Sequence, residues 1–187
     1  MDNSIDFATL FPDWTPQLIR LNQNHIFKAF DCGDNDLNDF LFYDSKIHLK
    51  HLNHTTFILE APNEIIAYYS LANDLLRVEY IEPLRKVFDD IYLDGEYEEW
   101  LFEQRQFPAV KIGRLAVNVK YQRQGIGSFI IDSLIYSFTH NNKTGCQFIT
   151  VDATINASEF YEKNEFVFLT DKDEYKESRS MYRCLLK

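Results

Sequence analysis

Two glycines one residue apart mark the segment best suited to chemistry. Gly125 and Gly127 lie in the run Gln122 to Ser128, QRQGIGS, between a strand-like stretch and a helix-like one. Backbone N–H groups in the first turn of a helix are unpaired and carry partial positive charge, and glycines let an anion approach them closely. Arg123 adds a cation and Ser128 a hydroxyl. This run is suited to binding phosphate; the alternative is an ordinary turn that begins a helix.

Two common phosphate-binding motifs do not match this run. A Walker motif requires Gly-Lys-Ser or Gly-Lys-Thr, and no lysine follows Gly127. The dinucleotide fingerprint requires a third glycine, which is missing here. The phosphate-binding hypothesis therefore depends on the neighbouring elements.

Histidines and cysteines give little support for a metal site. His48, His51 and His54 are spaced by three residues, and on a helix they would spread over about a third of its circumference. No carboxylate or cysteine is placed to complete their ligand set, so we expect no metal. Three cysteines, odd in number and far apart, are expected to be reduced thiols: Cys32, Cys146 and Cys184.

The elements around the glycines are predicted to alternate between strands and helices. Apolar residues recur at helical spacing after Gly125, which predicts a helix from the glycines to about residues 141–145. Strands are expected at 55–60 and 65–71, forming a hairpin, and at 109–119, 148–153 and 180–186. A short helix is expected at 157–164. Together these elements predict an α/β or α+β fold, with a sheet flanked by helices.

An earlier helix is expected to follow a turn-rich segment, FDCGDN. Asp34 or Asn35 could cap this helix, which would carry Leu37, Phe40, Leu41 and Ile47 on one face. Residues 73–107 interleave acidic and aromatic side chains, and we interpret them as a mostly helical acidic insertion. Its charges are expected to form a solvated face, the alternative being a site for a cationic ligand.

Length and charge narrow the class of protein. A chain of 187 residues with 45% hydrophobic residues predicts one domain, residues 1–187. No apolar run is long enough to cross a bilayer and no signal sequence is visible, so we expect a cytoplasmic protein without membrane contact. The net charge of −10 disfavours nucleic acid as a partner; it would attract cationic substrates or simply favour solubility.

The segment Gly113 to Ile131, GRLAVNVKYQRQGIGSFII, resembles the acetyl-CoA segment of GNAT N-acetyltransferases. Gln122, Gly125 and Gly127 match the family's Gln/Arg-x-x-Gly-x-Gly/Ala. The run Asn156 to Asn164 is similar to a second family region, which ends in Phe-Tyr-Glu-Lys-x-Gly-Phe. Further similar pieces, FxCG and AYYSL, stand in the expected order. The resemblance implies a GNAT fold with a mostly antiparallel mixed sheet.

The same resemblance implies a cofactor, acetyl-CoA, and a set of site residues. Backbone amides of Gln124, Gly125, Ile126, Gly127 and Ser128 would hold the pyrophosphate, with Gln122 and Arg123 beside them. The strand edge at Leu115, Ala116 and Val117 would pair with pantetheine, and the N–H of Val117 would polarise the thioester carbonyl. Tyr161 would protonate the departing sulfur, or else be a core aromatic beside Phe160 and Phe166. Asn156 would contact the pantetheine arm, or cap a helix, or both.

Two positions depart from the family pattern. The sequence also does not identify a single general base. Glu165 stands where the family has glycine, so we expect Asn164 to adopt the left-handed conformation in its place. The family's alanine comes one position early, at Ala157. Candidate bases are Asp74, Glu79 and Asp152, the alternative being water or an amine that is already neutral.

The acceptor is not specified by the sequence. We expect a small amine or a protein amine. The same motifs resemble a branch of acetyltransferase toxins that acetylate aminoacyl-tRNA, which keeps tRNA as an alternative despite the acidic charge. A non-catalytic acyl-CoA-binding module and an interaction protein using the acidic insertion are further alternatives. The resemblance slightly favours a homodimer.

Overall fold

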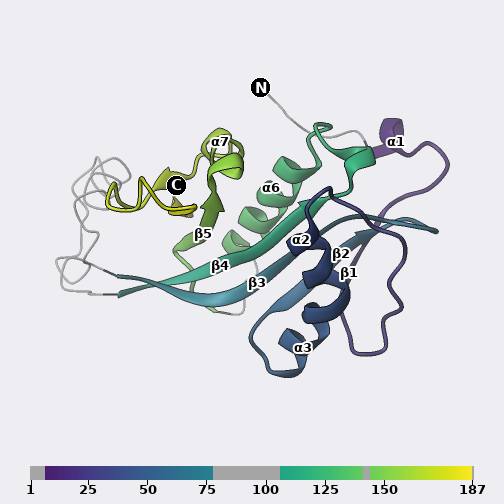
Figure 1. Cartoon of the computed structure of the whole chain (residues 1–187), viewed down its shortest axis with the longest axis horizontal. Coiled ribbons are helices and arrows are strands. Elements are labelled where there is room, and N and C mark those ends of the chain that lie inside the picture. The colour runs from purple at the N-terminus through teal and green to yellow at the C-terminus, as the bar shows by residue number, and fades with distance from the viewer. Residues whose placement is uncertain (1–6, 78–105, 141–143, 187) are drawn as a thin grey trace. The chain divides into compact units, whose positions relative to one another are not determined.

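The computed structural model describes residues 7–77, 106–140 and 144–186 (Figure 1). The helices are α1 (Phe7–Leu10), α2 (Asn35–Asp39), α3 (Ser45–Lys50), α6 (Ile126–Thr139) and α7 (Ile155–Lys163), with a π-helical stretch at Phe40–Asp44 between α2 and α3. The strands are β1 (Gln17–Arg20), β2 (Thr55–Glu60), β3 (Ile65–Arg77), β4 (Gln106–Val117), β5 (Phe148–Thr154), β6 (Val167–Phe168) and β7 (Ser178–Cys184).

These strands form a seven-stranded sheet with the order β1-β2-β3-β4-β5-β7-β6. The pairs β1–β2, β2–β3, β5–β7 and β6–β7 are antiparallel. This sheet with its flanking helices confirms the predicted α/β class. By its internal contacts the chain divides into two compact units, Met1–Ala72 with Ile112–Leu134, and Asn73–Lys111 with Ile135–Lys187.

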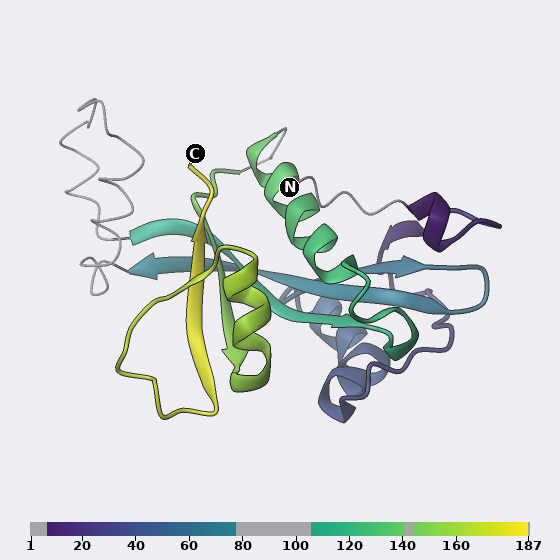
Figure 2. The ribbon, with the colours of Figure 1, turned by 90° about the horizontal axis from the view of Figure 1, so that it is seen from above.

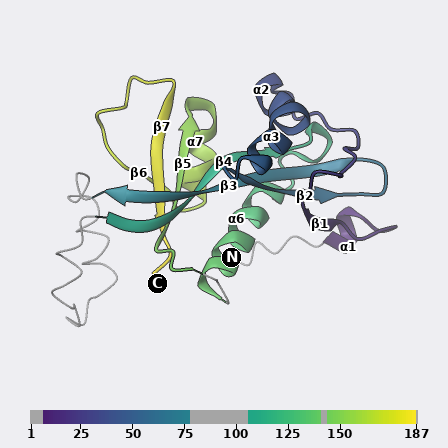
Figure 3. The ribbon, with the colours of Figure 1, turned by 90° about the horizontal axis from the view of Figure 1, so that it is seen from below.

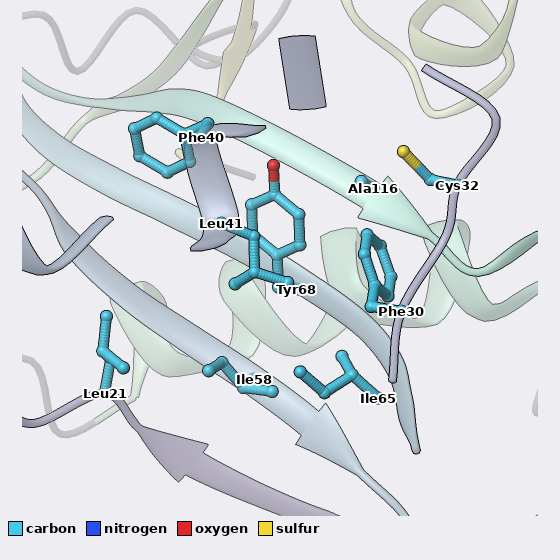
Figure 4. Close-up of a cluster of buried hydrophobic side chains, with 9 residues drawn as sticks. All are labelled: Leu21, Phe30, Cys32, Phe40, Leu41, Ile58, Ile65, Tyr68 and Ala116. Atoms are coloured by element: carbon cyan, nitrogen blue, oxygen red, sulfur yellow. The ribbon is translucent and has the colours of Figure 1, made fainter. Parts of the chain in front are cut away.

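The first unit has helices on both faces of its strands. α2 and α3 lie on one face and the first part of α6 on the other (Figures 2 and 3). β3 is buried without interruption from Ile65 to Ser70, as expected for a strand covered on both sides. Figure 4 shows the core on the α2 side: Leu21, Phe30, Cys32, Phe40, Leu41, Ile58, Ile65, Tyr68 and Ala116.

The second unit has its own core. Phe148 of β5 and Tyr182 of β7 lie diagonally across the two paired strands, since Phe148 is opposite Cys184 and Tyr182 is opposite Thr150, and each is almost completely buried. Their rings meet edge to face at 5.9 Å. α7 packs on β5 and β7.

Several predicted boundaries need correction. The hairpin and the helix capped by Asp34 are confirmed, because the Asp34 side chain accepts from the Leu37 N–H. Ile47 is 54% exposed and not on the buried face, because the π-helical stretch changes the periodicity before α3. α6 ends at Thr139, earlier than predicted. β1 and β6 were not predicted, since each has only a few residues.

Both ends of the predicted acidic insertion belong to strands. Asn73–Arg77 continue strand β3, and Gln106 and Phe107 begin β4, so these ends of the predicted insertion are not helical. The polar side chains of residues 73–77 hid an extension of the hairpin strand. Residues 78–105, including Glu79, lie outside the described residues.

Candidate functional site

Strand β4 leaves the sheet through a fixed turn at Asn118. The Asn118 side chain is 4% exposed, and its amide donates to the Ile65 carbonyl at 3.1 Å. Its carbonyl oxygen accepts from the Lys120 N–H, also at 3.1 Å. A 3₁₀ turn follows at Val119–Tyr121. These bonds set the direction in which the chain enters the glycine run.

The glycine run contains two residues in left-handed conformations. Arg123 has φ of 60° and Gly125 has φ of 85°. Gly125 lacks the Cβ that makes this conformation costly, whereas Arg123 adopts it at the expense of about 1 kcal/mol. Alternation of left- and right-handed residues turns successive N–H groups toward one concave side, which is a known form of anion site.

The N–H groups that open α6 have no protein partner. Within residues 7–77, 106–140 and 144–186, no hydrogen bond is made by the backbone N–H groups from Gln124 to Ser128. The first bond of the helix runs from the Phe129 N–H to the Gly125 carbonyl at 3.0 Å. Gln124 and Gly125 are exposed, while the Ile126 side chain is buried and anchors the helix start. Five consecutive amides are therefore available to an anion.

Gln122 stabilises this turn through its side-chain amide. Its side-chain nitrogen donates to the carbonyl oxygens of Cys32 at 2.8 Å and of Val117 at 3.0 Å. The residue expected to lie beside the cofactor thus ties the end of β4 to the glycine run and to the segment before α2. Gln124 makes one such bond, to the Lys120 carbonyl.

Glu64 is a second brace, which the sequence analysis missed. Its carboxylate accepts from Lys120 Nζ at 2.6 Å and from the Tyr121 hydroxyl at 2.7 Å. The hydrogen bonds from Lys120 and Tyr121 hold the pKa of Glu64 below its ordinary value. Glu64 belongs to the turn between β2 and β3, and a carboxylate in a hairpin turn gives no sequence signal for this contact.

In the second unit, Tyr161 is buried in the middle of α7. It is 6% exposed and lies edge to face with Phe160 at 5.0 Å and with Phe166 at 5.3 Å. Burial raises the pKa of its phenol. A phenol in this environment keeps its proton at physiological pH, which a general acid requires. These aromatic contacts also match the alternative of a core residue.

Asn156 lies inside the first turn of α7 and is not its N-cap. The helix begins at Ile155, two residues earlier than predicted, and Thr154 occupies the cap position. The Asn156 side chain is exposed. The prediction that Asn156 caps the helix is therefore wrong, because β5 passes into α7 without an intervening turn.

The turn after α7 also differs from the prediction. Glu165 itself has φ of 62°, whereas Asn164 has φ of −99°. Arg183 stabilises this turn by donating to the Asn164 carbonyl at 2.7 Å and to the Glu165 carboxylate at 2.9 Å. Glu165, which stands where the family pattern has glycine, therefore adopts the left-handed conformation itself.

Two of the candidate bases are engaged by other side chains. Asp152 accepts from Lys111 and from the Ser180 hydroxyl. Desolvation by burial raises the pKa of Asp152, but these bonds outweigh it and hold the pKa below its ordinary value. Asp74 accepts from the Thr150 hydroxyl. These partners lower the affinity of the Asp152 carboxylate for a proton, which makes it a weaker general base.

The histidines do not share one helix. His48 lies in α3, His51 follows it, and His54 precedes β2, with Nδ1 of His48 2.7 Å from Nδ1 of His54. In the described part of the chain, no three His, Cys, Asp or Glu residues are grouped so that they could hold a metal. None of Cys32, Cys146 and Cys184 forms a disulfide. Among the described helices, none is long and apolar enough to span a membrane.

Comparison with known proteins agrees with this arrangement of strand, turn and helix. Residues 101–181 match the family described as acetyltransferase (GNAT) domain. The matched stretch includes β4, the glycine run, α6 and α7. A search of curated protein sequences gave no significant match.

Solved structures share the GNAT fold over nearly the whole chain. A tyrosine-to-phenylalanine mutant of the toxin AtaT, bound to the C-terminus of the antitoxin AtaR, is 19% identical with a TM-score of 0.68, and the match covers 91% of this chain and 92% of that one. A tyrosine-to-phenylalanine mutant of KacT is 20% identical with a TM-score of 0.68, covering 90% and 95%. AtaT complexed with acetyl-methionyl-tRNAfMet is 18% identical with a TM-score of 0.68, covering 90% and 94%. The GNAT fold expected from the sequence motifs is confirmed.

The site residues that the resemblance implies belong to both compact units. The first holds Leu115, Ala116, Val117 and the run from Gln122 to Ser128, which Gln122 joins to Val117 directly. The second holds Asn156 and Tyr161, both on α7.

Proposed function

We propose that this chain transfers the acetyl group of acetyl-CoA to a primary amine. The observation that carries the proposal is the row of five unpaired N–H groups from Gln124 to Ser128, directly after β4. A diphosphate is the group that such a row accommodates, with Arg123 as a mobile cation beside it. The GNAT domain and the acetyl-CoA bound in AtaT structures support this identity of the ligand.

Each site residue has a proposed role. Leu115, Ala116 and Val117 present a strand edge to the pantetheine arm, and the Val117 N–H polarises the carbonyl oxygen. Asn156, exposed on the first turn of α7, contacts the same arm. Bound acetyl-CoA supplies the activated thioester. Tyr161 donates its phenol proton to the departing sulfur, and water or the Tyr161 phenolate takes up the proton that the amine loses.

The acceptor is a small amine or an amino group of a protein. The net charge of −10 favours a neutral or cationic acceptor over a polyanion, because long-range attraction raises the rate of encounter with cations. The protein is proposed to act in the cytoplasm, as one domain that pairs with a second copy.

A second candidate acceptor is aminoacyl-tRNA. The specific observation is the likeness to AtaT complexed with acetyl-methionyl-tRNAfMet, at a TM-score of 0.68. Likeness to the AtaT–AtaR pair adds an antitoxin as a candidate protein partner.

Binding and transfer are tested separately. Acetyl-CoA at 100 times its dissociation constant should stabilise the protein by about 2.7 kcal/mol, seen as a rise in Tm. Labelled acetyl-CoA is then incubated with small amines, a lysine peptide and methionyl-tRNA, and the labelled product identifies the acceptor. A protein that binds acetyl-CoA but acetylates none of these would be a binding module and would overturn the proposal.

A further inference from the structure

Arg114 is an exposed guanidinium that no carboxylate neutralises within the described ranges of the chain. Two arginines of the second unit differ, because Arg179 pairs with Asp171 and Asp173, and Arg183 pairs with Glu165. Arg114 donates a hydrogen bond from Nη1 to the neighbouring Gly113 carbonyl at 2.7 Å. Nε and Nη2 therefore remain to bind an external acceptor.

The guanidinium is held over an aromatic platform. Arg114 Cζ lies 5.2 Å from the centre of the Phe40 ring, and Phe40 is 4% exposed. Phe40 stacks on Tyr68 at 6.1 Å, and the Tyr68 hydroxyl donates to the Leu37 carbonyl at 2.6 Å. Figure 4 shows Phe40 and Tyr68 side by side in the core. Because the platform is fixed, the arginine loses less side-chain freedom when it binds a ligand.

The two histidines described above complete the surroundings of Phe40. Its ring lies 5.4 Å from His48 and 6.2 Å from His54. Gly113 makes room for His54, since a Cβ there would lie 2.6 Å from His54 Nε2. Around Phe40, the chain thus places one permanent cation and two imidazoles.

The place of Arg114 on β4 relates it to the proposed reaction. It precedes Val117 by three residues in the same strand. At about 3.3 Å per residue, the two positions are roughly 10 Å apart. The Arg114 side chain extends from the strand over Phe40, so a group bound by its guanidinium would lie at least about 10 Å from the proposed position of the thioester.

We propose that Arg114 binds an anionic group on the amine acceptor. This inference rests on the function proposed above and narrows its substrate class to primary amines that carry a phosphate at least about 10 Å from the nitrogen. The planar fork of arginine suits two oxygens of one phosphate, and lysine would bind it only as a point charge. Because the protein as a whole is acidic, an anionic acceptor requires a local positive charge, and Arg114 supplies one.

The test compares two amines that differ in the phosphate alone. The probes are 6-aminohexyl phosphate and 6-aminohexanol, with acetyl-CoA as donor. Wild type should acetylate 6-aminohexyl phosphate with a kcat/KM at least about 10-fold higher than for 6-aminohexanol, because a hydrogen bond between two charged groups is stronger than one between neutral groups. Arg114→Gln should abolish this preference by raising KM for the phosphate and leave the alcohol unchanged. Arg114→Lys should keep part of the preference.

Control variants separate binding from stability. Arg20→Gln removes another exposed arginine of the first unit and should keep the full preference. If Arg114 acted only through its contact with Phe40, Arg114→Gln would lower Tm and slow both amines equally. Such an equal loss would overturn the inference. So would a preference for the phosphate that survives in Arg114→Gln, or the absence of any preference in wild type. If wild type does not bind acetyl-CoA at all, the proposed function is overturned together with this inference.

Discussion

The side-chain nitrogen of Gln122 lies 3.0 Å from the main-chain oxygen of Val117. The strand position that is proposed to polarise the thioester carbonyl is thereby tied to the loop that is proposed to hold the diphosphate. Both proposed contacts to acetyl-CoA then depend on one side-chain amide. This makes Gln122 a positioning residue.

Replacing Gln122 should loosen the loop and weaken acetyl-CoA binding. Gln122→Ala removes the hydrogen bonds to Cys32 and Val117, at roughly 1 kcal/mol each. We expect the Kd for acetyl-CoA, measured by calorimetry, to rise about 10-fold. Gln23→Ala, which removes one exposed bond to the Lys46 carbonyl, is the matched control and should bind normally. Equal Kd values for the two variants would contradict this role.

Alanine at Gly125 should disturb the same loop through the backbone. With φ of 85°, this position strains any residue that has a Cβ, at a cost of about 1 kcal/mol or more. The strain would displace the neighbouring N–H groups and lower both Tm and the affinity for acetyl-CoA. Gly145→Ala is the control, because a Cβ there meets nothing within 4 Å. Unaltered affinity in Gly125→Ala would argue against this loop as the binding site.

Tyr161→Phe should stop transfer without preventing binding. Loss of a general acid slows a reaction by roughly 10²–10⁴-fold, whereas the ring and its contacts with Phe160 and Phe166 remain. Since burial raises the pKa of Tyr161, wild-type kcat should not fall through its ionisation below about pH 10. Tyr175→Phe, at a side chain that is 96% exposed, should have wild-type activity. Full activity in Tyr161→Phe would leave the residue as a core aromatic.

Glu64→Gln should destabilise the first unit in a pH-dependent way. The pKa of Glu64 is lower in the folded protein than in the unfolded chain, so its contribution is present above the unfolded pKa of about 4.3. It is lost as the pH falls through the folded pKa. We therefore expect a lower Tm than wild type at pH 7 and a difference that shrinks below about pH 4. A Tm difference between wild type and Glu64→Gln that is constant from pH 7 to pH 3 would rule out a stabilising role for the Glu64 charge.

The sequence predicted what short-range patterns encode. Alternating apolar residues and a short turn predicted the β2–β3 hairpin, and Gly125 followed by apolar residues at helical spacing predicted the start of α6. Asp34 was one of two predicted caps, with Asn35, because a capping side chain acts only three residues away. These features depend on neighbours within a few positions.

Long-range contacts account for what was missed. Glu64 and Lys120 are 56 residues apart, and no local pattern joins them. Glu165 adopts a left-handed backbone because Arg183 binds both sides of the turn, which the missing glycine alone could not indicate. The His48–His54 pair likewise forms after the chain leaves α3.

The central claim is that the amides from Gln124 to Ser128 bind the diphosphate of acetyl-CoA. Its most direct test is the amide NMR spectrum of ¹⁵N-labelled protein titrated with acetyl-CoA and, separately, with acetyl-pantetheine, which lacks the diphosphate. Our account expects the signals of these five residues to shift with acetyl-CoA and to stay in place with acetyl-pantetheine. Saturable acetyl-CoA binding that leaves all five signals unmoved would contradict it.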